Sequence, residues 1–211
     1  PAVLALHDHG GFYTHGREKL VEGLSDSPAL EDFVSRCYEG RYWASELARR
    51  GYAVLVTDVL GWGERRMPFE DLPGEVQKEL SQLPEGSHEW AEVFNGFCGG
   101  FSAVLDQNAN FAGVSWMGLV LWDDRRALDY LVSRPEVDSG RVACGGLSGG
   151  GWRSTYLCGA EPRLAAAAIA GWMARIGDQL LHENRCHLGL YTAPSVYRAL
   201  DHPDIAAIGV P

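Results

Sequence analysis

A serine set among glycines constrains this chain more than any other feature. The segment Gly146–Gly150 (GLSGG) lies between an apolar run at 141–145 and a helical pattern at 152–158. A serine at a tight strand-to-helix turn takes a strained conformation, and side chains two residues to either side would clash with the adjacent strand and helix. The turn raises the hydroxyl above the sheet, beside helix N–H groups that favour negative charge. The pattern predicts that Ser148 is a nucleophile; an idle serine in a glycine-rich turn is the alternative.

The spacing of apolar runs predicts the fold class. Continuous hydrophobicity is typical of strands that are covered on both faces. Four runs have this character: 2–7, 53–58, 141–145 and 164–170. Helical patterns lie between them, at 42–50, 117–133 and 152–158. This alternation predicts a single α/β domain over 1–211, with a mostly parallel sheet flanked by helices and with 141–145 between 2–7 and 164–170.

Composition excludes several classes of partner. The chain has 211 residues, of which 46% are hydrophobic, so it is long enough for a sizeable core. A formal net charge of -10 disfavours nucleic acid and anionic lipid as partners. The sequence contains no run of 18 apolar residues, so it predicts no membrane-spanning helix. The five cysteines include no C-x-x-C pair, which predicts free thiols and weakly favours a reducing, cytoplasmic compartment. A homo-oligomer is compatible with this composition.

The segment 67–110 interrupts the alternation of strands and helices. It contains prolines, glycines and the aromatic residues Trp90, Phe94, Phe97 and Phe101. Long interruptions inside a domain usually form lids or binding loops. We therefore expect its aromatic residues to shape an apolar acyl pocket above Ser148; a surface insertion without substrate contact is the alternative.

A second motif, His7–Phe12 (HDHGGF), follows the first predicted strand. Acyl transfer needs two donors for the oxyanion of its tetrahedral intermediate. The amide after the nucleophile, that of Gly149, is one candidate. A glycine-rich loop after the neighbouring strand supplies the other, and we expect it to be the amide of His9 or Gly10.

Two other interpretations of polar residues were weighed. Alternate residues at a strand end point the same way, so His7 and His9 have the spacing to chelate a metal, but no further ligand cluster supports this. His182 and His187 are five apart, which is poor for one helical face. We expect no metal or other cofactor. Asp58, after the second predicted strand, is expected to be an ordinary strand-end cap, with orientation of loop backbone as the alternative.

Several segments together resemble a known family. They are Leu6–Gly11 (LHDHGG), Arg50–Asp58 (RGYAVLVTD), Gly61–Arg65 (GWGER), and the serine motif followed by Gly151–Arg153 (GWR). This set resembles the dienelactone hydrolase and acetyl xylan esterase-like branch of the α/β-hydrolases, over about 1–172 and 194–211. The resemblance implies a Ser-His-Asp hydrolase of carboxylic esters, including acetylated carbohydrate, that uses no cofactor. It also makes Trp62 and Trp152 candidates for contact with a small-molecule ester substrate.

The chain departs from that family at its ends. Both ends are apolar, so we expect an internal piece that lacks the first and last strands, with the catalytic acid and histidine beyond Pro211. The remaining histidines match no motif: His15, His88, His182, His187 and His202. Two alternative functions stay open, a prolyl-oligopeptidase-type peptidase and a non-catalytic binding module with the same fold.

Overall fold

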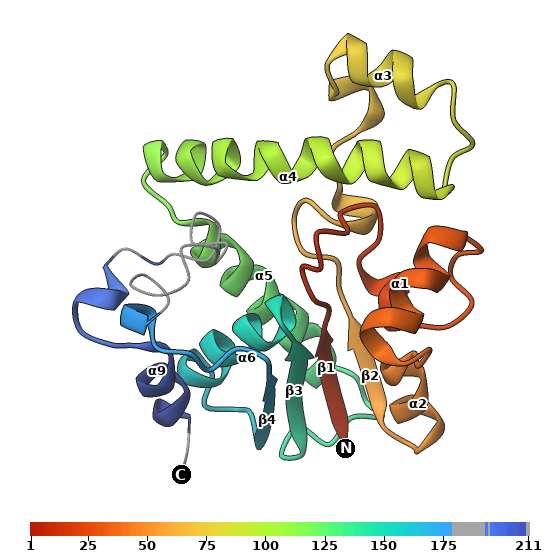
Figure 1. Ribbon diagram of the computed structural model, residues 1–211. Coiled ribbons are helices and arrows are strands. Elements are labelled where there is room, and N and C mark those ends of the chain that lie inside the picture. The colour runs from red at the N-terminus through yellow and green to blue at the C-terminus, as the bar shows by residue number, and fades with distance from the viewer. Residues whose placement is uncertain (179–192, 194, 210–211) are drawn as a thin grey trace.

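The computed structural model describes residues 1–178, 193 and 195–209, and its centre is a four-stranded parallel sheet (Figure 1). The strands are β1 (Ala2–Leu6), β2 (Ala53–Val56), β3 (Val142–Leu147) and β4 (Ala166–Ala170), in the order β2-β1-β3-β4. All three neighbouring pairs are parallel. The prediction that the strand before Ser148 lies between the strands near residues 2–7 and 164–170 is therefore confirmed.

Seven α-helices of the described residues surround or cap this sheet. They are α1 (Pro28–Tyr38), α2 (Trp43–Arg49), α3 (Gly74–Leu80), α4 (His88–Phe111), α5 (Trp116–Val132), α6 (Gly149–Ala160) and α9 (His202–Ile208). Short 3-10 turns occur at η1 (Arg17–Lys19), η2 (Gly63–Arg65), η3 (Phe69–Asp71) and η4 (Val196–Arg198). The predicted helices at 42–50, 117–133 and 152–158 correspond to α2, α5 and α6.

Two helices that the sequence analysis did not predict begin at serine caps. The hydroxyl of Ser27 accepts the amide of Leu30 at the start of α1, and that of Ser87 accepts the amide of Trp90 at the start of α4. Each cap satisfies one of the amides that lack a partner in the first turn of a helix. These local signals were available in the sequence.

The two faces of β1 pack into different apolar clusters. Leu4 and Leu6 pack with Leu128 of α5 and Leu157 of α6. Ala5, on the opposite face, packs with Leu20, which directly follows η1, and with Ala44 of α2. Because successive side chains of a strand point to opposite faces, helices on both sides explain the continuous hydrophobicity of this segment.

The strand β4 differs from its prediction. A fully covered strand was expected at 164–170, but Ala166–Ala170 alternates between exposed and half-buried residues. The strand pairs with β3 along one edge; its exposed residues Ala166, Ala168 and Ala170 share one face, and the half-buried Ala167 and Ile169 share the other. Continuous hydrophobicity here reflects small residues and not burial.

The segment 67–110, which was expected to be a lid or loop insertion, is largely helical. It contains η3, α3 and nearly all of the 24-residue helix α4. Figure 1 shows α4 lying across the end of the sheet, with α3 above it. The cavity described below joins α4 to the loops that follow β1 and β2, so α4 covers the carboxyl end of the sheet. Where the structure is described, no helix combines the length and the apolar character needed to cross a bilayer.

Candidate active site

Ser148 occupies a strained turn between β3 and α6. Its φ of 54° and ψ of -115° place a non-glycine residue in the half of backbone space that glycine favours. A Cβ on Gly146 would lie 2.3 Å from the carbonyl oxygen of Leu6, and one on Gly150 would lie 2.0 Å from the same atom. Both the strained serine and the need for glycine on either side are confirmed. The elbow packs directly against the backbone at the end of β1.

The side chain of Ser148 is half-buried, and among the described residues no group hydrogen-bonds its hydroxyl. The next residue, Gly149, is the first of α6, so its amide has no acceptor within the helix. A crevice of about 10 Å³ adjoins it, roughly the size of one water molecule. Gly149 and His9 both line this crevice, whereas Gly10 is exposed and does not. The structure thus brings the elbow and the loop after β1 together.

A fully buried lysine donates hydrogen bonds to the backbone of that loop. The ammonium group of Lys19 donates to the carbonyl oxygens of Asp8, at 3.1 Å, and His9, at 3.2 Å. The same carbonyl of His9 accepts the indole N–H of Trp62 and the amide of Phe12, each at 3.2 Å. In a trans peptide the carbonyl and the following amide point in opposite directions. The amides of His9 and Gly10 therefore point away from Lys19.

The charge of Lys19 is matched by one carboxylate. Its ammonium nitrogen lies 3.7 Å from Asp8 Oδ2 and 5.1 Å from the ring centroid of Phe33. Tyr38 donates its hydroxyl to the other oxygen of Asp8. Burial lowers the pKa of Lys19, and the carboxylate opposes that shift. No sequence pattern distinguishes this lysine from an exposed one, and the sequence analysis missed it.

The histidines of the same loop have structural partners. His7 Nε2 accepts the amide of Val59 at 3.1 Å, so Nδ1 carries the proton that it shares with the carbonyl of Asp8 at 2.8 Å. His9 Nδ1 accepts the amide of Gly11, and its Nε2 lies 3.1 Å from the Tyr13 hydroxyl. Burial lowers the pKa of His7, in accord with a neutral ring. The described residues contain no group of three or more metal-ligating side chains.

Asp58 orients loop backbone, so the expectation of an ordinary strand-end cap is wrong. Its carboxylate accepts the amide of Arg17 at 2.6 Å and that of Glu64 at 2.9 Å. A Cβ on Gly16 or Gly63 would lie within 2.4 Å of this carboxylate, so glycine is required for the two loops to approach it. Asp58 thereby joins the loops that follow β1 and β2. Burial raises its pKa.

A buried ion pair supports the helix of the elbow. Arg153 of α6 donates from Nε and Nη2 to the two carboxylate oxygens of Asp124 on α5, at 3.0 and 2.5 Å. The arginine and aspartate side chains are 3% and 1% exposed, so removing either partner would leave a buried charge. Arg153 also lines the crevice beside Gly149.

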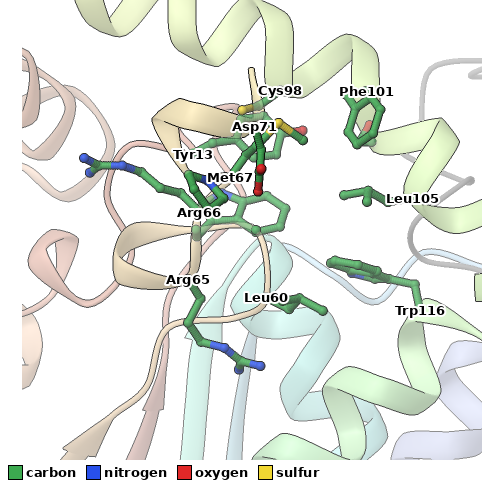
Figure 2. Close-up of a pocket in the computed structure, with 14 residues that line it drawn as sticks. Tyr13, Leu60, Arg65, Arg66, Met67, Asp71, Cys98, Phe101, Leu105 and Trp116 are labelled. Atoms are coloured by element: carbon green, nitrogen blue, oxygen red, sulfur yellow. The ribbon is translucent and has the colours of Figure 1, made fainter. Parts of the chain in front are cut away.

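A larger apolar cavity of about 260 Å³ lies between α4 and the loops of the sheet (Figure 2). Trp62 and Trp116 line both this cavity and the crevice. The indole N–H of Trp62 is engaged with the loop, and its role in substrate contact stays a prediction. Trp152 is 1% exposed and lines only the crevice. Its role in substrate contact stays a prediction.

The aromatic residues of α4 do not all face this cavity. Phe101 lines it, while Trp90 and Phe94 stack on each other at 5.2 Å and line a separate hollow with the side chain of Arg66. The expectation that the aromatic cluster forms one pocket is therefore wrong for Trp90 and Phe94. Trp90, Phe94 and Phe101 are spaced i, i+4 and i+11 and share one face of α4, so the distance along the helix axis separates the two groups.

No described histidine serves Ser148 as a base. His202 contacts the Tyr197 hydroxyl and the carbonyl of Ala174, both at 3.1 Å. His15 contacts the hydroxyls of Thr14 and Ser25, and His88 pairs with Asp32. His182 and His187 lie outside the described residues.

A parallel sheet whose interior strand ends in a strained Gly-x-Ser-x-Gly turn defines the α/β-hydrolase fold. Comparison with known proteins agrees. The chain is 29% identical over 166 residues to a Bacillus subtilis protein named "Putative hydrolase YtaP", covering 78% of this chain and 40% of that protein. It superposes with a TM-score of 0.55 and 17% identity on the crystal structure of a "putative acetyl xylan esterase" from Bacteroides fragilis, covering 79% of this chain and 36% of the other. No protein-family model matches the chain. The chain thus has the α/β-hydrolase fold and spans well under half the length of these two proteins.

Proposed function

We propose that this chain carries the nucleophile and oxyanion-binding groups of a serine hydrolase that cleaves carboxylic esters. The observation that carries the proposal is the backbone of Ser148, whose φ of 54° is held between glycines that contact the end of β1. Strain of this kind persists where the surrounding structure imposes it, and it is concentrated at functional sites. The names of the two similar proteins, a hydrolase and an acetyl xylan esterase, support the same class of reaction.

The proposed reaction proceeds through an acyl-enzyme. The Ser148 oxygen adds to the ester carbonyl carbon while its proton passes to a general base. The amides of Gly149 and of His9 or Gly10 stabilise the oxyanion, and the alcohol leaves with the proton. Water then cleaves the acyl-serine to release the carboxylic acid and restore the hydroxyl. The family resemblance assigns the base to a histidine oriented by an acid, and no described histidine has that position.

Labelling with a fluorophosphonate probe tests the nucleophile directly. In the full-length protein the probe should modify Ser148, located by peptide mass spectrometry. Ser148→Ala should abolish labelling and lower turnover of p-nitrophenyl esters roughly 10³-fold or more. Ser133→Ala is the matched control, because that serine is exposed at the C-cap of α5 and should not affect labelling.

Other outcomes select the alternatives. Neither labelling nor turnover in the full-length protein would favour a non-catalytic module. Labelling of Ser148 with cleavage of prolyl peptides, and none of esters, would favour the peptidase.

A further inference from the structure

We propose that the ester substrate carries an apolar acyl chain several carbons longer than acetyl, and that this chain binds in the cavity beneath α4. This inference rests on the proposed ester hydrolysis and narrows its substrate class. The cavity measures about 260 Å³, whereas the crevice of about 10 Å³ has room for roughly one water molecule on the same measure. The methyl group of an acetyl ester would leave most of this space unfilled.

One stripe of α4 forms the upper wall of the cavity. Cys98, Phe101, Ser102 and Leu105 are spaced i, i+3, i+4 and i+7, which places them on one face of a helix. Figure 2 shows Phe101 and Leu105 on the same side of the cavity as Trp116. Leu60, Trp62 and Met67, from the loop after β2, complete an apolar lining.

Apart from Asp71, whose side chain is exposed, the polar side chains around the cavity have partners. Ser102 donates its hydroxyl to the carbonyl of Gly99, and the Tyr13 hydroxyl lies 3.1 Å from His9 Nε2. The guanidinium groups of Arg65 and Arg66 point away from the cavity in Figure 2. They bind Asp123 and Glu85, respectively, together with backbone carbonyls. Asp71 is exposed at the rim.

This lining disfavours a sugar as the occupant. Each hydroxyl of a carbohydrate that enters an apolar space without a partner loses its hydrogen bonds to water, which is unfavourable. An alkyl chain has no such requirement and gains from leaving water. The lining therefore favours an apolar chain over acetylated carbohydrate at this position.

The position of the cavity indicates the acyl half of the ester. Trp62 and Trp116 line both this cavity and the crevice that Gly149 and His9 line, so the two spaces adjoin at these indole rings. The oxyanion that these backbone groups would bind belongs to the acyl carbon. The chain attached to that carbon therefore begins beside the two tryptophans and extends toward α4.

A series of p-nitrophenyl esters with the same leaving group tests the chain length. In the full-length protein kcat/KM should rise from acetate to hexanoate by about fourfold per methylene, the factor that corresponds to about 0.8 kcal/mol. Equal kcat/KM across the series, or a maximum at acetate, would overturn the proposal.

Two neighbouring substitutions on α4 test whether the acyl chain of the substrate binds in the cavity. Leu105→Trp fills the cavity and should lower the ratio of kcat/KM for hexanoate to that for acetate at least tenfold. Val104→Trp is the matched control, since Val104 is 39% exposed, lies outside the cavity lining and should leave the ratio unchanged. If neither variant changes the ratio of kcat/KM for hexanoate to that for acetate, the cavity is not the acyl-chain site.

Binding without chemistry separates this inference from the proposed function. The Ser148→Ala variant should bind hexanamide more tightly than acetamide by calorimetry, and Leu105→Trp in that background should remove the difference. Hexanamide binding in a protein that cleaves no ester would reject the proposed function but keep the apolar site. Ester cleavage that labels Ser148 without chain-length preference would reject the apolar site alone.

Discussion

The loop after β1 and the helix α4 lie on opposite sides of the same cavity, and different interactions hold them. The loop is fixed by hydrogen bonds and buried charge, since the carbonyls of Asp8 and His9 both accept the ammonium of Lys19. The helix is held mainly by apolar contacts, and three glycines (Gly96, Gly99 and Gly100) weaken its middle turns. A polar network requires all its members, whereas an apolar contact tolerates exchange. The loop is therefore expected to maintain geometry, and the helix to adjust specificity.

The largest difference between the two regions should follow from removing the buried lysine. Lys19→Met leaves the carboxylate of Asp8 buried without its cation and removes the donor to two carbonyls. We expect the free energy of unfolding to fall by about 3–5 kcal/mol in urea denaturation. Leu105→Ala, on half-buried α4, should cost only about 1 kcal/mol. Equal losses for the two variants would contradict the comparison.

The loss of stability at acid pH should depend on the loop after β1 and not on α4. Burial lowers the pKa of His15 to about 4, and the ring stacks on Phe12 at 5.3 Å between centroids. In the unfolded chain a histidine binds its proton near pH 6.5. Between pH 6.5 and 4 the unfolded state therefore binds more protons, so stability falls as the pH falls, by up to about 3 kcal/mol. In urea denaturation across this pH range, the free energy of unfolding of His15→Gln should fall less steeply with falling pH than that of the wild type. Gly100→Ala, on α4, should keep the wild-type slope.

The smallest expected effect has opposite signs in the two regions. A Cβ on Gly100 meets nothing within 4 Å, so Gly100→Ala should stabilise the protein by about 0.5–1 kcal/mol. Gly10 has a φ of +57°, and a Cβ there would lie 2.3 Å from the carboxylate of Asp8. Gly10→Ala should therefore lower the thermal midpoint while Gly100→Ala raises it. A rise in both would show that the loop is less constrained than its contacts imply.

Local patterns in the sequence determined the parallel sheet and the strand, turn and helix around Ser148. The strand before Ser148, the tight turn and the helix after it depend on residues within about ten positions of one another, so their periodicity and glycines were sufficient. The same holds for the parallel order of the sheet, which follows from the alternation of strands and helices. The i, i+3, i+4, i+7 stripe of α4 was also present in the sequence, but the glycines and prolines of 67–110 led to its interpretation as a lid or loop insertion.

Only the tertiary structure decided which polar residues support the site. Lys19 donates to the carbonyl of Asp8 within the loop after β1, and Asp58, after β2, accepts the amide of Arg17 from the loop after β1 and that of Glu64. The pair of Asp124 and Arg153 joins two helices in the same way. Whether a charged side chain is buried depends on what distant segments place over it, and a buried charge persists only where those segments also supply its partner. That information is carried by packing, so single-sequence patterns contain no sign of it.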